Sequence, residues 1–515
     1  MLNLDKNHNP KKNAGILAEI VGRPSIAVQE TVELFNQFRQ ESQSFPKKYP
    51  RKPFSLGEAF FRLFSKASNL GELPKILVDS QGQVFPEWFE ILENEFNSLE
   101  TKRIKEVNVV DFGAVGDGKT DCTAAFRKAI GKGRVKVMVP PGIFITKGIR
   151  LPSMTVLIGA GKGKTTIKLH DDAPKSTRLI TNLNYWKGNH HLFVGSLSLD
   201  WNVERLGDTS KTSTWGNHSS CLTYANVTYG WIKDVEAINP GLHCFDISST
   251  LYNYAGDRFR ARGGSKYVWL DNLNGFGFGD DGITTHHSDF IFISNSHMCD
   301  PSGRAHQKGF SNSNGFEIDD GSQNVLLVQN SSARCFGGVE IKAHENSSAA
   351  ANVQIIGHIS LNDNRSFNFR HIGHHKSTDA ESKTAYNIMA GNLLSIAPIF
   401  SDLYKDSTPR GLVVSAYKNV VINHFKLIGN PDYDYKANPV IAIQYRARNV
   451  ALKNVMIRDF NKAGPGIKVF GGENRADSVE ISNVEIEGSS AQAINIGIGI
   501  QDIKIEKVKS VNVYR

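Results

Sequence analysis

The clearest pattern in the chain is a repeat of polar and apolar positions that begins near residue 190. A short polar turn carrying Asn, Asp or Ser precedes a strand in which apolar and polar residues alternate. The copies are NVTYGWIKDVEAIN (Asn226–Asn239), SDFIFISNSHM (Ser288–Met298), QNVLLVQNSSA (Gln323–Ala333), KNVVINHFKLIGN (Lys418–Asn430), RNVALKNVMIRDF (Arg448–Phe460), DSVEISNVEIEG (Asp477–Gly488) and QDIKIEKVKSVNV (Gln501–Val513). Adjacent copies start roughly 24–35 residues apart, which is the period of one coil of a β-solenoid.

A second, shorter pattern lies between these copies: a small residue, an apolar residue, a polar residue and another apolar residue. It is found in CFDIS (Cys244–Ser248), GITTH (Gly282–His286), GFEID (Gly315–Asp319), GVEIK (Gly338–Lys342), GIKVF (Gly466–Phe470) and AINIG (Ala493–Gly497). Each coil therefore contains at least two short strands. Stacked coils form parallel sheets with neighbouring strands about 4.8 Å apart, with apolar stacks inside and polar ladders outside.

Residues 1–105 differ from the rest because they carry apolar residues at helical spacing. Three amphipathic segments stand out: Ser25–Ser42, Phe54–Leu70 and Phe85–Arg103. The third ends in cations, as the helix dipole prefers. We predict a small helical head that serves attachment or oligomerisation, followed by one β-helical catalytic domain over residues 106–515.

From Val107 the pattern is a strand, a Gly-rich turn and a short helix beginning near Thr123, with Asp121 or Thr120 as its cap. The later stretch GAGKGKTT (Gly159–Thr166) invites a phosphate-loop interpretation. Its first glycine stands one residue too close to the Gly-Lys-Thr, and the following TTIKL alternates like a strand. We therefore predict a turn between two strands.

Charge and cysteine content restrict the classes of binding partner and of structural site that we expect. The net charge of +9 and the pI of about 9.1 favour an anionic partner. No Lys/Arg cluster is interleaved with aromatics, so we expect no nucleic acid. The five cysteines are scattered, which argues against a zinc site or a disulfide framework. The polar start MLNLDKNHNPKK indicates no signal peptide, and no stretch is long and apolar enough for membrane insertion.

Three stretches resemble a known family. VVDFGAVGDGKTDCTAAFRKAI, VMVPPGIFIT and LIGAGKGKTTIKL resemble the opening of the pectate-lyase-like right-handed parallel β-helix proteins, and the resemblance covers residues 107–515. That family takes in polygalacturonase-type glycosidases, polysaccharide lyases, alginate epimerases and phage tailspikes. The resemblance implies an all-β, right-handed, single-stranded parallel β-helix that is capped by a helix and binds a carbohydrate polymer along one face.

A narrower resemblance concerns function. GDDGITTHHS followed by NGFEIDDGSQN resembles the β-helical pre-neck appendage proteins of small Bacillus phages, members of which cleave cell-wall teichoic acid. It implies a virion tail or baseplate component, attached through the N-terminal segment, that acts at the host cell surface. By analogy with tailspikes a homotrimer is expected. A chain of other origin would be cytoplasmic.

Acidic residues recur at similar positions in four consecutive coils. They are Asp246, then Asp280 and Asp281, then Glu317, Asp319 and Asp320, then Glu340, which is followed by Lys342. Later coils carry Lys468 and Asn495 at this position, so the acidity is confined to the middle coils. Glycosidic hydrolysis needs one carboxyl group to protonate the leaving oxygen and another to activate water or attack. Like charges one coil apart raise one pKa and produce this division.

The candidate catalytic residues are therefore Asp280, Asp281, Glu317, Asp319 and His286. The candidate polymer-binding residues are Asp246, His287, His306, Asp320, Glu340, Lys342 and Trp215. Polygalacturonase-like enzymes carry an Asp-Asp pair, an Arg-x-Lys and a Gly-His-Gly. Asp280–Asp281 resembles the pair, but Glu340 stands where the Arg would, and the Gly-His-Gly is missing, with His286, His287 and His306 as substitutes. We expect Trp201 and Trp215, which lie in polar loops, at the surface for sugar stacking.

Other interpretations remain open from the sequence. The acids could be turn residues or solvent-facing ladder members. They could bind Ca²⁺ in a lyase or epimerase, with Arg304, Lys308 or Lys342 as the base. The protein could also be a non-catalytic receptor-binding spike or a structural part of a virion. The segment HIGHHKSTD (His371–Asp379) is His-rich without ligand spacing, and we expect a loop near the site. We predict no metal and no cofactor for a hydrolase, and Ca²⁺ only for a lyase.

Overall fold

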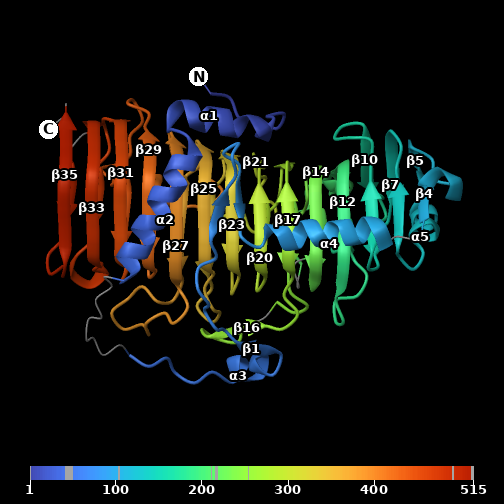
Figure 1. Cartoon of the computed structure of the whole chain (residues 1–515), viewed down its shortest axis with the longest axis horizontal. Helices are drawn as coiled ribbons and strands as arrows, with labels where there is room; N and C mark the ends of the chain where they lie inside the picture. Colours follow the sequence, from blue (N-terminus) through green and yellow to red (C-terminus); the bar gives the residue numbers. More distant parts are fainter. Residues whose placement is uncertain are drawn as a thin grey trace.

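The computed structural model describes residues 2–40, 50–102, 105–209, 211–214, 218–252, 254–489 and 492–511. Over these residues the chain winds into a long solenoid whose strands form a 19-stranded and a 12-stranded sheet. Successive coils contribute neighbouring strands, and the pairing between coils is parallel. The fold is thus the expected right-handed parallel β-helix with small N-terminal helices (Figure 1).

The larger sheet, here called the long sheet, contains the strands predicted from the first pattern. Its strands are β4 (Lys105–Asn108), β5 (Asp117–Asp121), β6 (Val135–Met138), β7 (Gly142–Thr146), β9 (Thr155–Ile158), β10 (Thr165–Leu169), β12 (Asn189–Asp200), β14 (Val227–Ile238), β17 (Lys266–Asp271), β18 (Asn274–Phe276), β20 (Asp289–Ser294), β21 (His297–Cys299), β23 (Gln323–Ala333), β25 (Ala351–Leu361), β27 (Tyr386–Ile396), β29 (Lys418–Ile428), β31 (Arg448–Phe460), β33 (Asp477–Ser489) and β35 (Ile503–Val511).

The smaller sheet, here called the short sheet, contains every copy of the second pattern. Its strands are β8 (Ile149–Leu151), β11 (Ile180–Asn182), β13 (Leu222–Ala225), β15 (Phe245–Ser248), β19 (Ile283–His286), β22 (Asn314–Asp319), β24 (Gly337–Ala343), β26 (Arg365–His371), β28 (Arg410–Ser415), β30 (Ile441–Gln444), β32 (Ile467–Val469) and β34 (Ile494–Ile496). The apolar positions of both sheets point inward and build one continuous core along the solenoid. Strand β10 confirms that GAGKGKTT is a turn between strands.

An Asn at the second position of five consecutive long strands of the long sheet forms a hydrogen-bonded ladder between coils. Asn324, Asn352, Asn387, Asn419 and Asn449 stack on consecutive coils, and each has a positive φ between 53° and 64°. Asn tolerates this left-handed conformation better than most residues do. The side-chain amide of each of the last four donates to the side-chain carbonyl of the Asn one coil earlier, at 2.7–3.0 Å. The repeated Asn therefore both turns the chain and joins the coils.

The N-terminal helices pack on the outside of the long sheet. Figure 1 shows α2 (Pro24–Gln40) and α4 (Phe89–Lys102) crossing its strands, while α1 (Asn13–Ile20) lies along one edge. Phe35 and Phe38 of α2 pack on Met389, Val421 and Ala451 of the sheet. In the same way Trp88 and Leu92 pack with Phe193, Trp231 and Phe292. These helices shield an outward apolar stripe of the sheet from water.

Two of the three helix predictions are confirmed with shifted ends, and the third is largely wrong. The prediction Ser25–Ser42 corresponds to α2, with residues 41 and 42 outside the described part, and Phe85–Arg103 corresponds to α4. In Phe54–Leu70 only α3 (Leu56–Arg62) is helical. Ser65–Ala67 forms β1, because it pairs antiparallel with β16 (Phe259–Ala261) of a distant loop. Helix α1 was missed because its sequence NAGILAEI is only weakly amphipathic, unlike that of α5, which has the same length.

The remaining elements are short. Helix α5 (Thr123–Ile130) covers the first coil and begins where predicted, but its N-cap residue is Cys122 and not Asp121 or Thr120. Oδ1 of Asp121 accepts a hydrogen bond from the Thr123 backbone nitrogen at 2.9 Å in the turn before the helix. Within the described residues, no helix has both the length and the apolar character needed to cross a bilayer. The others are β2 (Ile76–Val78), β3 (Val84–Pro86) and the 3₁₀ turns η1 (Pro10–Lys12), η2 (Val109–Phe112), η3 (Val203–Leu206) and η4 (Gly472–Asn474).

The alternation of inward and outward side chains can be tested with variants at two neighbouring residues of one strand. Leu452 of β31 is fully buried in the core, whereas Lys453 is exposed. We expect Leu452→Ala to lower the free energy of unfolding by about 2–5 kcal/mol, because it leaves a cavity between coils. The matched variant Lys453→Ala should stay within about 0.5 kcal/mol of the parent in urea unfolding. Equal losses in both variants would contradict the assigned register.

Candidate functional site

Two outward columns of polar residues cross the middle coils of the short sheet. The parallel register aligns, in the first column, Asp246, Thr284, Glu317, Glu340 and Asn368 of strands β15, β19, β22, β24 and β26. The second column lies two residues further along the same strands, where His286 pairs with Asp319 and Lys342 with Arg370. Because neighbouring strands lie about 4.8 Å apart, this register holds the acids of adjacent coils close together.

Asp280 and Asp281 lie in the turn before β19 and not on a strand. Asp281 is only 2% exposed. Its Oδ1 accepts hydrogen bonds from the backbone nitrogen and from Nδ2 of Asn314, at 2.9 and 3.1 Å. Asp280 is the more accessible of the two, and its Oδ2 lies 3.0 Å from Nε2 of His306. These adjacent carboxyl groups therefore have different surroundings.

A histidine that the sequence analysis missed, His243, lies between three of the acids. Its Nε2 is 3.6 Å from Oδ2 of Asp281 and 3.9 Å from Oδ2 of Asp280. Its Nδ1 is 3.9 Å from Oδ2 of Asp246. Burial alone would lower the pKa of His243, but Asp246 and Asp280 outweigh burial and raise this pKa to about 9. The ring is thus an imidazolium at neutral pH.

Lys342 and His286 neutralise the second half of the site. Nζ of Lys342 lies 2.6 Å from Oε1 of Glu317 and 3.6 Å from Oδ2 of Asp319. Burial opposes the ammonium, but the surrounding carboxylates raise the pKa of Lys342 well above its ordinary value. His286 bridges Asp246 and Asp319, with Nδ1 and Nε2 at 3.5 and 3.7 Å from their oxygens. The Lys342 ammonium therefore forms ion pairs with carboxyl groups of the protein.

The surroundings shift the pKa values of Asp280 and Asp281 in opposite directions. For Asp280, burial opposes ionisation, but the nearby His243 imidazolium and the hydrogen-bonded His306 prevail and lower its pKa. For Asp281, burial and the negative charges of Glu317 and Asp280 raise the pKa well above its ordinary value. The two adjacent carboxyl groups are therefore shifted in opposite directions, so that Asp280 favours the carboxylate and Asp281 favours the protonated acid.

The next coil repeats this division. Burial and the charge of Asp320 raise the pKa of Asp319 to about 7. For Asp320 burial acts in the same direction, but His344 outweighs it and lowers the pKa. Nδ1 of His344 lies 3.0 Å from Oδ2 of Asp320, and the Tyr252 hydroxyl donates to that oxygen at 2.6 Å. His344 and Tyr252 therefore stabilise the Asp320 carboxylate, which lies beside the titratable Asp319.

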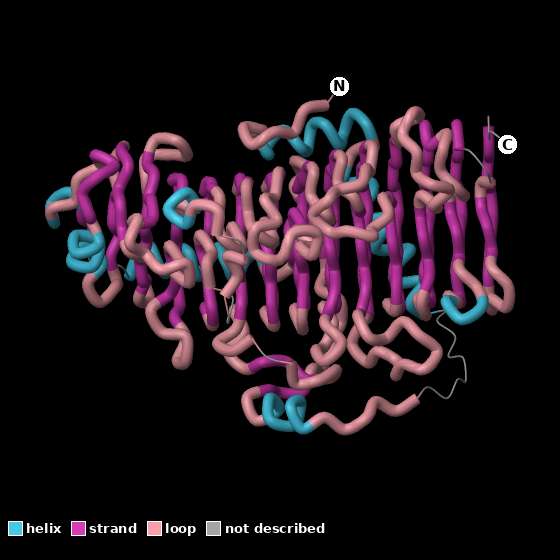
Figure 2. Tube along the Cα trace, turned by 180° about the vertical axis from the view of Figure 1, so that it is seen from behind, coloured by secondary structure: helices cyan, strands magenta, loops and turns pink. Residues whose placement is uncertain are grey.

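Loops cover the columns and leave an opening at one side. Figure 2, seen from behind relative to Figure 1, shows loops crossing the middle strands. The Tyr252 ring stands edge-on to His286, with centroids 4.6 Å apart, and Tyr254 contacts His344 in the same manner. A pocket of about 330 Å³ opens beside His306, and its lining includes Arg304 and Lys308. Asp208 and Asp402 also line this pocket, and His306 connects it to Asp280.

The other predicted residues lie further from the acid pair. His287 occupies a turn, where its Nδ1 accepts a hydrogen bond from the Ala261 backbone. Glu340 is bound by Asn368 at 2.8 Å and by Arg370. Trp215 lies outside the described residues. The expectation for Trp201 is wrong, because its ring is fully buried under Arg205 and its indole nitrogen donates to the Thr177 carbonyl.

Some site residues that the sequence analysis missed could have been predicted from the strand pattern, and others could not. Ser366–Arg370 reads SFNFR, which matches GVEIK with Ser in place of Gly, so the ladder could have been extended to Arg370. His243 stands three residues before Asp246 but lies outside the strand pattern. Tyr252 belongs to a loop whose path no periodicity predicts. It reaches Asp320 only because the loop folds back over the sheet.

Three groups of side chains in the site could hold a cation. They are His243–Asp280–Asp281, His286–Glu317–Asp319 and Asp319–Asp320–His344, each with ligand atoms within 4.8 Å of one another. Ca²⁺ prefers six to eight oxygen ligands. Every group includes an imidazole, and His243, His344 and Lys342 already supply positive charge. These residues fit a self-neutralised acid–base site better than a Ca²⁺ site.

Several known proteins with similar sequences come from Bacillus and its phages. Residues 106–340 match the family described as rhamnogalacturonase A/epimerase, pectate lyase-like. The putative phage-related protein YobO of Bacillus subtilis (strain 168) is 50% identical over 434 residues, covering 84% of this chain and 54% of that protein. The pre-neck appendage protein of Bacillus phage phi29 is 42% identical over 445 residues, covering 84% and 51%. The chain spans about half the length of the curated relatives it matches.

A solved structure agrees with these matches. The crystal structure of the N-terminal fragment of bacteriophage phi29 gene product 12 superposes with a TM-score of 0.73 at 40% identity, covering 82% of this chain and 69% of that one. The chain therefore belongs to the pectate-lyase-like parallel β-helix family, and its homologues include the phage pre-neck appendage proteins.

Proposed function

We propose that the protein is a depolymerase of the glycoside hydrolase type that cleaves an anionic cell-surface polymer. The observation that carries this proposal is the opposite pKa shift of two adjacent carboxyl groups, lowered for Asp280 and raised for Asp281, next to His306, which lines a pocket. Hydrolysis of a glycosidic bond needs such a pair. The relation to phage appendage proteins supports a role at the surface of a host cell.

The surroundings of each carboxyl group suggest its role. Asp281, kept protonated by burial and by Glu317, would donate a proton to the leaving oxygen. Asp280, more accessible and kept ionised by His243 and His306, would activate the attacking water. Glu317 and Asp319 with Lys342 would set the field around the acid, and His286 would hold Asp246 and Asp319 in place.

The pocket beside His306 suggests the substrate class. Arg304, His306 and Lys308 line it, and cations attract a polymer that carries carboxylate or phosphate groups. Capsular polysaccharide, teichoic acid and uronate-containing polymer share this chemistry. The resemblance to pre-neck appendage proteins favours teichoic acid among them.

A lyase or epimerase is the second candidate, and the state of Lys342 disfavours it. A lyase base must be unprotonated to remove a proton from the sugar, whereas Glu317 and Asp319 keep this ammonium charged. A non-catalytic receptor-binding spike is the third candidate. Binding an anionic polymer gives no reason to concentrate carboxyl groups in the middle coils.

Assembly in a virion tail as a homotrimer completes the proposal. Phe54, Leu56 and Leu63 around α3 are 70–79% exposed, and apolar patches of this kind mark contact surfaces. We expect light scattering of the full-length chain to give three times the mass of one chain. A monomer would contradict both the trimer and the assignment of this patch to oligomerisation.

Amide variants of the acid pair test the catalytic proposal. We expect Asp280→Asn and Asp281→Asn each to lower kcat by roughly 10²–10⁴-fold while polymer binding persists. Asn is nearly isosteric with a protonated Asp, so Asp281→Asn should keep the melting temperature of the parent. Asp172→Asn, a change at an exposed acid far along the chain, is the matched control.

The assay uses purified capsular, teichoic and uronate polymers, with products analysed by mass. A gain of one water per cut identifies a hydrolase, and unsaturated ends identify a lyase. Cleavage at the parental rate by both amide variants would show that the acid pair is not the catalytic site. The hydrolase should work in the presence of a chelator, whereas a Ca²⁺-assisted lyase should not.

The raised pKa of His243 predicts how stability depends on pH. Its folded-state pKa of about 9 lies above the ordinary value of 6.5. The imidazolium therefore stabilises the fold fully below pH 6.5, and this contribution disappears as the pH rises to about 9. The loss is on the order of 3 kcal/mol.

Melting temperatures of the parent and of His243→Gln between pH 6 and pH 9.5 measure this contribution. We expect the difference between the two proteins to be largest at the acid end and to shrink with rising pH. A constant difference over this range would mean that His243 does not titrate in the fold.

A further inference from the structure

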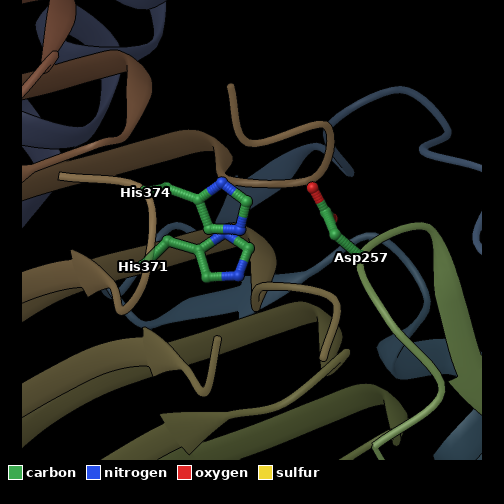
Figure 3. A group of neighbouring side chains, drawn as sticks. All are labelled: Asp257, His371 and His374. Carbon is green, nitrogen blue, oxygen red and sulfur yellow. The ribbon is translucent and has the colours of Figure 1, made fainter. Parts of the chain in front are cut away.

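A second cluster of ligating side chains lies outside the candidate site, at the end of strand β26. Figure 3 shows the rings of His371 and His374 beside each other, with the Asp257 carboxylate facing them from another loop. Each residue offers one nitrogen or oxygen within 4.8 Å of the others. Both histidines are buried and Asp257 is half-buried. More than a hundred residues separate Asp257 from the histidines, so only the fold unites them.

The hydrogen bonds of the two rings leave one nitrogen of each with a lone pair. A carbonyl oxygen only accepts, so Nε2 of His371 donates to the Ser347 carbonyl at 3.1 Å, and Nδ1 of His374 donates to the Ala380 carbonyl at 2.7 Å. Nδ1 of His371 then accepts from the Ser382 hydroxyl at 2.7 Å. Nε2 of His374 is buried and has no hydrogen-bond partner among the described residues.

Such an arrangement is characteristic of metal-binding histidines. Ligating imidazoles nearly always donate their other ring N–H to a carbonyl or carboxylate, which fixes the tautomer and the ring orientation. A buried, unpartnered nitrogen is costly unless something binds it.

The third residue is oriented in the same way. The Asp257 carboxylate accepts hydrogen bonds from the Lys383 backbone nitrogen at 2.6 Å and from the Thr384 hydroxyl. These bonds hold it against the loop that carries the histidines. Asp257, His374, Ser382 and Lys383 also line a pocket of about 770 Å³, which gives ions and water a route to the cluster.

We propose that Asp257, His371 and His374 bind a divalent transition-metal ion of the Zn²⁺ type. Two imidazole nitrogens and one carboxylate oxygen suit Zn²⁺, Co²⁺ or Ni²⁺, whereas Ca²⁺ and Mg²⁺ prefer oxygen alone. Ser382 would release Nδ1 of His371 to the ion, and a water from the pocket would fill a fourth position. The proposal is independent of the catalytic role given to Asp280 and Asp281.

The position of the cluster indicates what the ion would do. Asp257 lies in the loop segment that also contributes Tyr252 and Tyr254 to the cover over the acidic columns. His371 directly follows Arg370, the last charged residue of those columns. A metal ion joining Asp257 to His371 would therefore fasten the covering loop to the end of β26.

Metal content and melting temperature of the full-length chain test the proposal. After dialysis against EDTA and readdition of Zn²⁺, we expect about one ion per chain that survives gel filtration. At free Zn²⁺ about 100-fold above the Kd, the melting temperature should rise by roughly 2–4 °C. Mg²⁺ and Ca²⁺ at the same concentration should produce neither effect.

Variants assign the ion to this cluster. His374→Gln and Asp257→Asn should each lose the bound Zn²⁺ and the temperature shift. Asp257 is half-buried in a loop, so its variant keeps the test valid if His374→Gln fails to fold. His375→Gln changes the neighbouring histidine, whose ring stacks on Tyr445 at 5.0 Å, and should bind as the parent does.

Asp281→Asn separates this proposal from the catalytic one, because it should lose cleavage and keep the ion. The proposal fails if the parent binds no Zn²⁺, or if Asp257→Asn binds it as tightly as the parent. Loss of the ion in Asp281→Asn alone would place the metal in the acidic columns and overturn the proposal.

Discussion

The in-register stacking of coils is the constraint on which the rest of the structure depends. A parallel sheet places equivalent residues of successive coils about 4.8 Å apart, whatever their charge. Inside, this stacks apolar residues such as Ile318 and Ile341 into a continuous core. Outside, it brings Glu317 and Glu340 together at the same spacing. The regularity that builds the core therefore also forces like charges into contact.

That enforced contact has to be neutralised, and the structure does this with cations from several coils. Lys342, His243 and Arg370 each meet a carboxylate that they could not have reached in an unfolded chain. Removing one partner of a buried ion pair is strongly destabilising, because the other charge stays buried. Asp281, which is left without a full counter-charge, favours its protonated form, and Asp319 titrates near pH 7. Proton donors thus arise from incomplete neutralisation.

The two sheets of the solenoid have different covers. On the long sheet, outward apolar residues such as Trp231 and Met389 are shielded by N-terminal helices, which pack mainly through apolar side chains and add polar contacts such as that of Thr31 with Asn423. On the short sheet, the outward residues are charged, and the covering loops supply hydrogen bonds, as Tyr252 does to Asp320. The chemistry of each face therefore decides what covers it.

Local pattern by itself determined the strands, their alternation and the order of the coils. The copies around Gly315 and Gly338 were enough to place Glu317 and Glu340 in one column, because side chains alternate along strands and coils stack in register. The acidic middle coils followed from the same reasoning. The helix at Phe54–Leu70 failed because pairing of Ser65–Ala67 with β16 overrode its local preference.

Tertiary structure alone decided everything that loops contribute. His243 between Asp246 and Asp281, Tyr252 over His286, and Asp257 opposite His374 are juxtapositions of segments with no periodic relation. The charge states of Asp280 and Asp281 were equally out of reach, since identical neighbouring residues differ only in burial and in which cation meets them. Periodicity specifies which face of the sheet a strand residue occupies. The closure of loops decides which side chains it meets, and burial together with those neighbours decides its pKa.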